Sequence, residues 1–172
     1  MRRCRLRRVP ICLLQQSRYG TLGSSIVMTE TATLRAVVFR VGGLICALPA
    51  ESVREILPPL PATRIPGADP CVEGLVNVRG ALLTVVDAHR LTGEPRPGDV
   101  EPATLVVEVG GRTCGLVVSQ VLDFVELPAG HVAARTELPG VDPRLVRGVA
   151  RHGDRHYILL DLDNLVTPVF GR

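Results

Sequence analysis

The chain has 172 residues, of which 46% are hydrophobic and 3% aromatic, so aliphatic side chains must fill a core sized for one ordinary domain or two small ones. Its net charge of +3 conceals an asymmetry, because six arginines and no acid precede Met28, whereas the chain from Met28 onward carries 14 arginines against 17 acids. That balance of −3 argues against a phosphate-binding surface on the folded part, and no apolar run approaches the roughly 18 residues of a membrane span.

The N-terminal segment, residues 1–33, differs from the rest of the chain. A basic cluster at residues 2–8 is followed by an apolar run at residues 9–14, and two glutamines end that run at once. The run is short for a signal peptide. We therefore expect residues 1–33 to be a disordered tail, or an extension upstream of a true start at Met28.

From residue 34 onward, strand signals follow one another closely. Aliphatic and β-branched runs at residues 34–41, 44–48 and 53–57 indicate three strands. Gly42-Gly43, between the first two, is typical of a tight hairpin turn. The proline-rich stretch at residues 58–67 excludes a helix there.

A second hairpin comes next. Residues 74–78 and 81–86 are predicted strands that join at Arg79-Gly80, where the glycine supplies the positive φ of a two-residue turn. Asp87 is placed to cap a short helix that follows, because its side chain can accept a hydrogen bond from an unpaired backbone N–H. Residues 92–102, rich in Gly and Pro, are typical of a linker.

After the linker the pattern repeats, which indicates an internal duplication. A first block recurs 68 residues later, where Val41-Gly42-Gly43 matches Val109-Gly110-Gly111. A second block recurs 74 residues later, where Gly74 matches Gly148 and Val85-Val86-Asp87 matches Leu159-Leu160-Asp161. Each copy has about five short strands, and sheets this small usually close into barrels. The prediction is a mainly all-β domain over residues 34–170, with one barrel at about 34–91 and a second at about 103–166.

The second hairpin carries more polarity than a turn requires. Asn77 and Arg79 are polar, and the second copy replaces residues 77–80 by the sequence Arg-His-Gly-Asp at residues 151–154. Because the two copies share a fold, polar residues found in one copy alone are candidates for function. We expect Asn77 to hold the turn by a local hydrogen bond. Arg79 is either a solvated turn residue or a forked donor that meets a partner's carboxylate.

The same hairpin carries a family resemblance. Gly-Leu-Val-Asn-Val-Arg-Gly at residues 74–80, followed by Leu-Thr-Val-Val-Asp at residues 83–87, resembles the signature of the CheW family of bacterial chemotaxis adaptors. Residues 53–56 and 115–118 resemble further family segments, and residues 148–162 include stretches similar to its closing strands. The resemblance covers about residues 34 to 166.

This resemblance implies two five-stranded SH3-like β-barrels with short helices, no enzymatic activity and no cofactor. It implies a cytoplasmic adaptor, associated with membrane receptor arrays, that bridges a methyl-accepting chemoreceptor and the regulatory domain of a CheA-type histidine kinase. In the family, the positions of Val53, Glu55 and Arg79 lie in regions tied to receptor and kinase binding. The predicted protein-binding residues are Val53, Glu55, Gly74, Asn77, Arg79 and Gly80.

Two other classes of function are alternatives. A nucleic-acid-binding pair of small barrels needs a basic face and aromatic stacking platforms, for which the composition offers little. An enzyme needs a catalytic constellation assembled from scattered residues, because the sequence shows no nucleophile elbow and no phosphate-binding glycine loop. No catalytic residue is therefore predicted.

Cysteines and histidines give no sign of a metal site. The five cysteines form no CxxC pair, and their odd number fits a reduced cytoplasmic setting. We expect Cys46 and Cys114 to be core residues, whereas Cys71 lies near a loop. The four histidines show neither an HxH nor an HExxH pattern.

Overall fold

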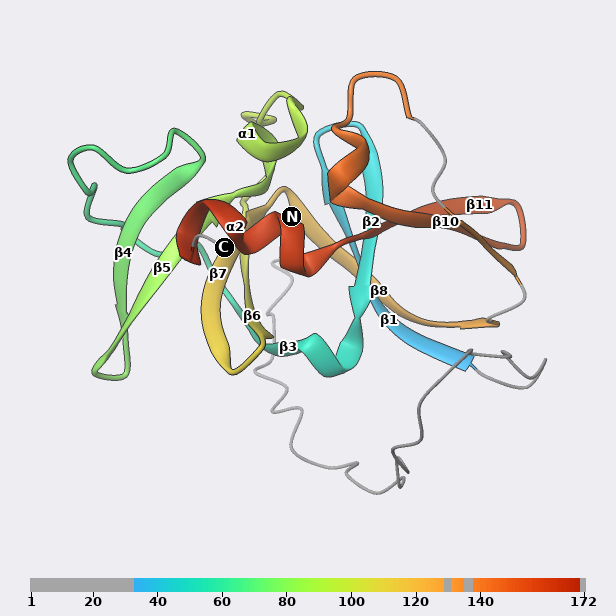
Figure 1. The fold of residues 1–172 in the computed structure, drawn as a ribbon, viewed down its shortest axis with the longest axis horizontal. Coiled ribbons are helices and arrows are strands. Elements are labelled where there is room, and N and C mark those ends of the chain that lie inside the picture. The colour runs from blue at the N-terminus through green and yellow to red at the C-terminus, as the bar shows by residue number, and fades with distance from the viewer. Residues whose placement is uncertain (1–32, 129–130, 135–137, 171–172) are drawn as a thin grey trace, which may run out of the picture.

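The computed structural model describes residues 33–128, 131–134 and 138–170. They form two β-sheets that lie side by side, with two short α-helices, α1 (Ala88–Thr92) and α2 (Leu162–Phe170) (Figure 1). The fold is therefore mainly β with short helices, as predicted. The predicted N-terminal extension, apart from Thr33, lies outside the described residues.

One sheet has six strands in the order β8-β1-β2-β11-β10-β9. Neighbouring strands are antiparallel except β2 and β11, which run parallel with Cys46 opposite Ile158. The strands are β1 (Thr33–Val41), β2 (Leu44–Pro49), β8 (Gln120–Pro128), β9 (Val132–Ala134), β10 (Val146–His152) and β11 (Arg155–Leu160).

The other sheet has five strands in the order β3-β6-β7-β5-β4. Here the parallel pair is β5 and β7, with Val85 opposite Gly115. The strands are β3 (Val53–Leu57), β4 (Val72–Val78), β5 (Ala81–Asp87), β6 (Ala103–Val109) and β7 (Arg112–Val118). Two single 3-10 turns, η1 (Ala50–Ser52) and η3 (Pro143–Leu145), lead into β3 and β10.

The pairing pattern supports the duplication. In each copy the chain makes a hairpin, an edge strand, a second hairpin and a helix, and the two sheets have equivalent neighbours throughout. The backbone N–H of Asp87 donates to the carbonyl of Cys71, and that of Asp161 donates to the carbonyl of Leu145, 74 residues later in each case. In the five-stranded sheet an isolated bridge between Thr63 and Leu75 takes the place of β9.

The strands are shared between the sheets differently from the predicted barrels at residues 34–91 and 103–166. β1 and β2 join β8 to β11 in one sheet, whereas β3, β4 and β5 join β6 and β7 in the other. Each sheet thus takes strands from both copies. The two copies have the same apolar pattern, so a strand of one copy fits the neighbours of the other as well as its own. Pairing within a copy and pairing between copies therefore have the same signature in the sequence.

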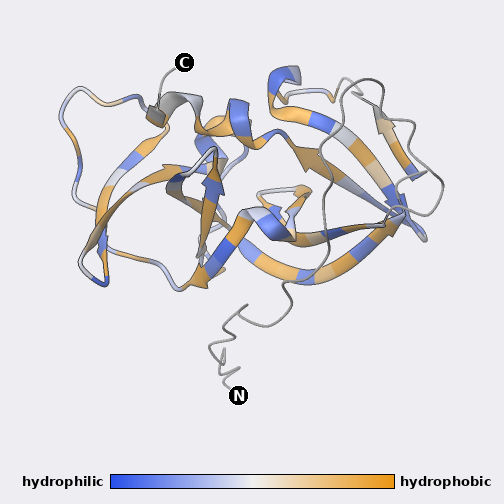
Figure 2. Ribbon diagram, turned by 60° about the horizontal axis from the view of Figure 1, so that its bottom comes forward, coloured by the Kyte–Doolittle hydropathy of each residue, from blue (hydrophilic) through white to orange (hydrophobic). Residues whose placement is uncertain are grey.

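Three clusters of apolar side chains hold this arrangement together. The central core lies between the sheets and takes residues from both, including Phe39, Leu48, Leu105 and Leu116, all 0% exposed. Figure 2 shows the alternation of apolar and polar residues along many of the strands. Each sheet also packs a smaller core of its own: one around Val38, Ala47, Leu127, Tyr157 and Leu159, and one formed by Val76, Val85 and Val117.

The short helices complete the ends of the strands. Asp87 caps α1 as predicted, with Oδ1 accepting a hydrogen bond from the backbone N–H of His89 at 3.0 Å. α2 places Leu165 and Val166 in the central core. Within the described ranges, no helix is long and apolar enough to cross a membrane.

Close backbone approach explains two glycines that the copies share. A Cβ added to Gly74, whose φ is 151°, would lie 2.2 Å from the carbonyl oxygen of Thr63. A Cβ added to Gly148 would lie 2.6 Å from the carbonyl oxygen of Ala133. No side chain fits at these separations, so both positions require glycine.

Val85 and Leu159 occupy equivalent buried positions, 2% and 4% exposed, in the two smaller cores. Val85→Ala and Leu159→Ala should each lower the free energy of unfolding by about 1–4 kcal/mol, because each removes buried apolar atoms and leaves a cavity. Urea denaturation measures this. Leu82→Ala, at a side chain 72% exposed, is the control and should change stability by less than about 0.5 kcal/mol. A neutral result at either buried position would contradict the alignment of the two copies.

Candidate protein-binding site

The β4–β5 hairpin ends in a turn of unusual backbone conformation. Arg79 has φ 54° and Gly80 has φ 89°, so both central residues are left-handed, as in the type I′ turns that match the twist of paired strands. The Oδ1 atom of Asn77 accepts a hydrogen bond from the backbone N–H of Gly80 at 2.8 Å. Asn77 thus holds the turn, as predicted.

Arg79 occupies a position that favours glycine. Among the described residues it is the one non-glycine residue with a positive φ, and its counterpart in the second copy is Gly153, with φ 61°. A left-handed conformation costs an ordinary L-residue roughly 1–2 kcal/mol. The first copy therefore retains an arginine side chain at a position where the second copy shows that glycine suffices. Local strain of this kind is common at functional sites.

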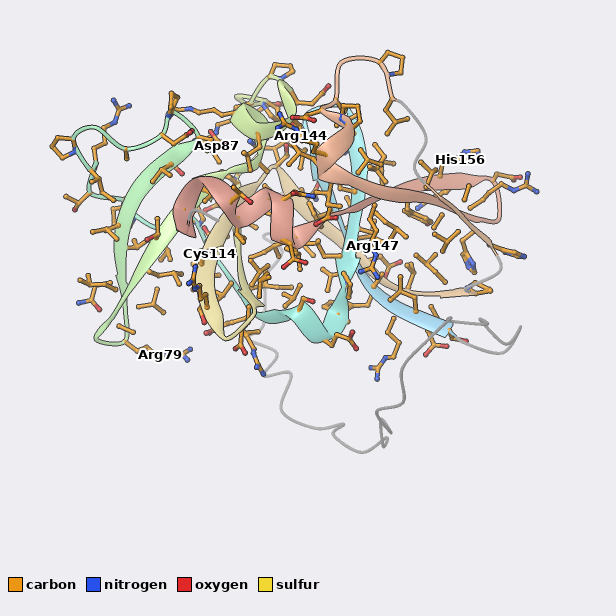
Figure 3. The ribbon with its side chains drawn as sticks, viewed as in Figure 1. Arg79, Asp87, Cys114, Arg144, Arg147 and His156 are labelled. Carbon is orange, nitrogen blue, oxygen red and sulfur yellow. The ribbon has the colours of Figure 1, made fainter. Side chains whose placement is uncertain are left out.

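The Arg79 guanidinium connects the two edges of the five-stranded sheet. Its Nη2 lies 2.5 Å from Oε1 of Glu55 on β3, while Arg79 itself follows β4, so the ion pair joins the first and last strands of the sheet. Figure 3 shows Arg79 at the end of the hairpin, with its side chain directed toward β3. The Arg79 side chain is 73% exposed, so the pair lies in high dielectric and stabilises the fold by at most about 1 kcal/mol.

The predicted binding residues are thus only partly brought together. Glu55, Asn77, Arg79 and Gly80 lie at one end of the five-stranded sheet, at or near the surface. Val53, by contrast, is 2% exposed and belongs to the central core. Gly74 is also buried, where it allows the chain at Thr63 to approach. These two buried residues support the surface and are not part of it.

Leu82 belongs to the same surface but was not predicted from the sequence. It lies directly opposite Asn77 across the hairpin and is 72% exposed, the highest value among the large apolar side chains of the described residues. Strand alternation places Leu82 on the same face as Val86, which is in the core. The pattern therefore predicts a buried residue, and only the position of the hairpin beyond the core reveals its exposure.

The cysteines of the described part of the chain are core residues. Cys46, Cys71 and Cys114 are buried and carry free thiols. Burial raises the thiol pKa of Cys46 and Cys114 to about 12. For Cys71, burial and a hydrogen bond with Asp69 raise the pKa to about 12. All three thiols therefore stay protonated, and hence unreactive, at neutral pH.

A buried Asp-His-Ser cluster is a second feature that sequence reasoning missed. Asp87 Oδ1 lies 2.8 Å from His89 Nδ1, and His89 Nε2 lies 2.8 Å from Ser119 Oγ. The order resembles that of a catalytic triad. Ser119, however, is 2% exposed and accepts a hydrogen bond from the backbone N–H of Gly42 at 3.0 Å. A cavity of about 410 Å³ is lined by Asp87 and His89 but not by Ser119, whose buried side chain lies away from it.

Metal binding has no candidate residues in the described ranges. No three His, Cys, Asp or Glu side chains of those ranges gather so as to hold an ion. His152 and His156, which flank the β10–β11 turn, are both exposed.

Comparison with known proteins identifies a family. The protein-family model named CheW-like domain matches residues 35–169 of this chain. The chain is 31% identical over 131 residues to the chemotaxis protein CheW of Rhizobium meliloti, covering 75% of this chain and 84% of that protein. It is 28% identical, over the same shares, to the probable chemotaxis protein CheW of Rhizobium etli. The crystal structure of the scaffolding protein TtCheW from Thermoanaerobacter tengcongensis has the same fold, with a TM-score of 0.71 and 24% identity over 76% of this chain and 90% of that chain.

Arg79→Gly tests whether the arginine is needed for the fold. The change relieves the left-handed strain and removes the exposed ion pair, and these two effects are of similar size. We expect the free energy of unfolding in urea to change by less than about 1 kcal/mol. Arg54→Ala, which removes another exposed pair, with Glu108, is the matched control. A loss of several kcal/mol at Arg79 alone would identify the Arg79–Glu55 pair as an essential closure of the sheet.

Proposed function

Because the chain belongs to the CheW-like domain family, we propose that it is a non-enzymatic signalling adaptor that couples the cytoplasmic tips of chemoreceptors to a CheA-type histidine kinase. The observation that carries the proposal is Arg79, an exposed arginine kept in a left-handed conformation on a rigid hairpin. The adaptor works in a chemotaxis or chemotaxis-like pathway and acts by binding alone.

The hairpin surface has the chemistry of a protein-binding site. A guanidinium has five N–H donors, and Glu55 accepts from Nη2, so further donors of Arg79 can meet a carboxylate on a partner. The type I′ turn and the Asn77 hydrogen bond fix the backbone, which lowers the entropy lost on binding. Glu55 directs the side chain toward the end of the sheet, so the guanidinium is positioned before a partner arrives.

Leu82 adds an apolar contact beside the charged group. It is exposed on the strand next to the turn, whereas its counterpart in the second copy is the polar and exposed His156. Arginine is enriched among the few residues that carry most of the binding energy of an interface, and burial of Leu82 by a partner would exclude water from beside it. This surface is small, which fits a reversible interaction of modest area.

The alternative of nucleic-acid binding is not favoured. Phe39 and Tyr157 are buried at 0% and 4% exposure, so neither offers a ring for stacking. Phe124, at 54% exposure, lies on β8 beside Asp123, whose negative charge opposes a phosphate backbone.

Reconstitution with purified components tests the adaptor function. The protein should bind a CheA-type kinase and increase receptor-dependent autophosphorylation, and it should itself consume no ATP. The kinase and receptor should come from the same organism, and the kinase without adaptor gives the baseline. Recovery of single-stranded DNA or RNA from a lysate, with no kinase bound, would refute the adaptor function.

Arg79→Glu should leave the fold intact and sharply weaken coupling, because it inverts the charge at the binding surface and faces Glu55 with a like charge. Reversal of an interface charge can make the free energy of binding less favourable by several kcal/mol. Thermal melts measure the first effect, and receptor-stimulated kinase activity measures the second.

Arg151→Glu is the matched control, because Arg151 lies in the equivalent hairpin of the second copy and is exposed. It should couple nearly as well as the unmodified protein. Normal coupling by both variants would show that the difference between the two hairpins is unrelated to binding.

A further inference from the structure

Three buried polar side chains join the two sheets beside α1. Asp87 ends β5, His89 lies in α1, and Ser119 connects β7 to β8; the three are 4%, 2% and 2% exposed. Their two contacts, Asp87 Oδ1 to His89 Nδ1 and His89 Nε2 to Ser119 Oγ, are each 2.8 Å. Breaking a buried hydrogen bond leaves its partner unsatisfied, so such a chain strongly favours a single geometry.

The hydrogen bonds in this chain run in one direction. Asp87 also accepts hydrogen bonds from the His89 backbone N–H and from Arg96, at 3.0 and 2.9 Å, as an ionised carboxylate does. His89 Nδ1 must therefore carry the hydrogen that it donates to Asp87. Ser119 Oγ accepts the Gly42 N–H, and its own hydroxyl hydrogen can be donated to Nε2 of a neutral imidazole. Every hydrogen in the chain then has an acceptor.

Both ends of this chain of hydrogen bonds are fixed to other elements. At one end, Arg96 of the segment after α1 contacts both Asp87 and Glu73, at 2.9 and 3.3 Å. At the other end, the Ser119 backbone N–H donates to the carbonyl of Arg40 at 2.9 Å, and its Oγ holds the β1–β2 turn through Gly42. The chain of hydrogen bonds thus extends from the five-stranded sheet to the first hairpin of the six-stranded sheet.

The segment after α1 holds the same turn a second time. Glu94 Oε2 accepts a hydrogen bond from the backbone N–H of Gly43 at 2.7 Å. A Cβ added to Gly42 would lie 2.5 Å from that same carboxylate oxygen. The first half of the predicted linker at residues 92–102 is therefore tied to both sheets through Glu94 and Arg96.

The equivalent junction beside α2 lacks this chemistry. The counterparts of Asp87, His89 and Ser119 are Asp161, Asp163 and Glu51. Asp161 caps α2 by accepting from the Asn164 N–H at 3.2 Å, whereas Asp163 and Glu51 are exposed. Ionised carboxylates only accept hydrogen bonds, so two of them cannot hydrogen-bond to each other. The chain of hydrogen bonds is thus a property of one junction and not of the fold.

We propose that Asp87, His89 and Ser119 form a latch that holds the β1–β2 turn against α1 and thereby sets the relative orientation of the two sheets. These are positioning residues, because none lies on the hairpin surface around Arg79. The latch would fix the relative position of binding surfaces on the two sheets of an adaptor. The proposal can be tested on the protein alone, without a partner.

Nuclear magnetic resonance of the isotopically labelled full chain provides the test. In the unmodified protein, the ring nitrogens of His89 should show the Nδ1–H tautomer at neutral pH, with Nε2 unprotonated. Ser119→Ala should remove the acceptor of the Gly42 amide and speed its hydrogen exchange about tenfold, the factor that corresponds to ~1.4 kcal/mol. Residual dipolar couplings should show a changed angle between the two sheets in Ser119→Ala.

Ser52→Ala is the matched control, because Ser52 is a half-buried serine that lines the hollow at the other junction. It should leave Gly42 exchange and the angle between the sheets unchanged. Ser119→Thr keeps the hydroxyl, and values like those of the unmodified protein would support the hydroxyl as the cause. An Nε2–H tautomer in the unmodified protein, or an unchanged angle between the sheets in Ser119→Ala, would overturn the proposal.

Discussion

The structure depends on a central core that neither sheet forms alone. Side chains from both sheets, among them Phe39, Leu48, Leu105 and Leu116, pack in one cluster, and α2 adds Leu165 and Val166. The smaller cores are made of few residues, and Val76, Val85 and Val117 form one of them. Burial of apolar area is the main favourable term in folding, and a cluster of three valines supplies little of it. The two sheets are therefore stable together because they share the larger core.

Strand exchange between the copies creates that shared core. The parallel pairs β2–β11 and β5–β7 each join a strand from one copy to a strand from the other. Separating the copies would break both pairs and divide the central core. The adaptor is consequently one rigid unit, which lets a surface on one sheet keep a fixed position relative to a surface on the other.

On this common frame the two copies carry different polar groups. The first copy has a strained arginine at its hairpin turn, and the second has glycine at the same position. The junction beside α1, where the two copies meet, has the Asp87–His89–Ser119 chain of hydrogen bonds, and the equivalent junction beside α2 has carboxylates at those positions. Both differences leave the backbone pairing intact. Duplication thus provides the fold, and the unshared side chains distinguish one hairpin, the proposed binding surface, and one junction beside α1.

Much of this protein follows from its sequence. Apolar runs and turn glycines place the five strands of the first copy within two residues of their observed bounds, and Asp87 is recognisable as a helix cap. These are local features, determined by backbone sterics and short-range hydrogen bonds. The signature at residues 74–87 also points to the family and to Arg79 as a binding residue.

Three features required the tertiary structure: the exchange of strands, the exposure of Leu82 and burial of Val53, and the meeting of Ser119 with His89. The exchange is hidden because both copies have the same pattern. Burial depends on where a strand ends relative to the core, and the serine and histidine lie 30 residues apart in the chain. Only long-range packing decides such contacts.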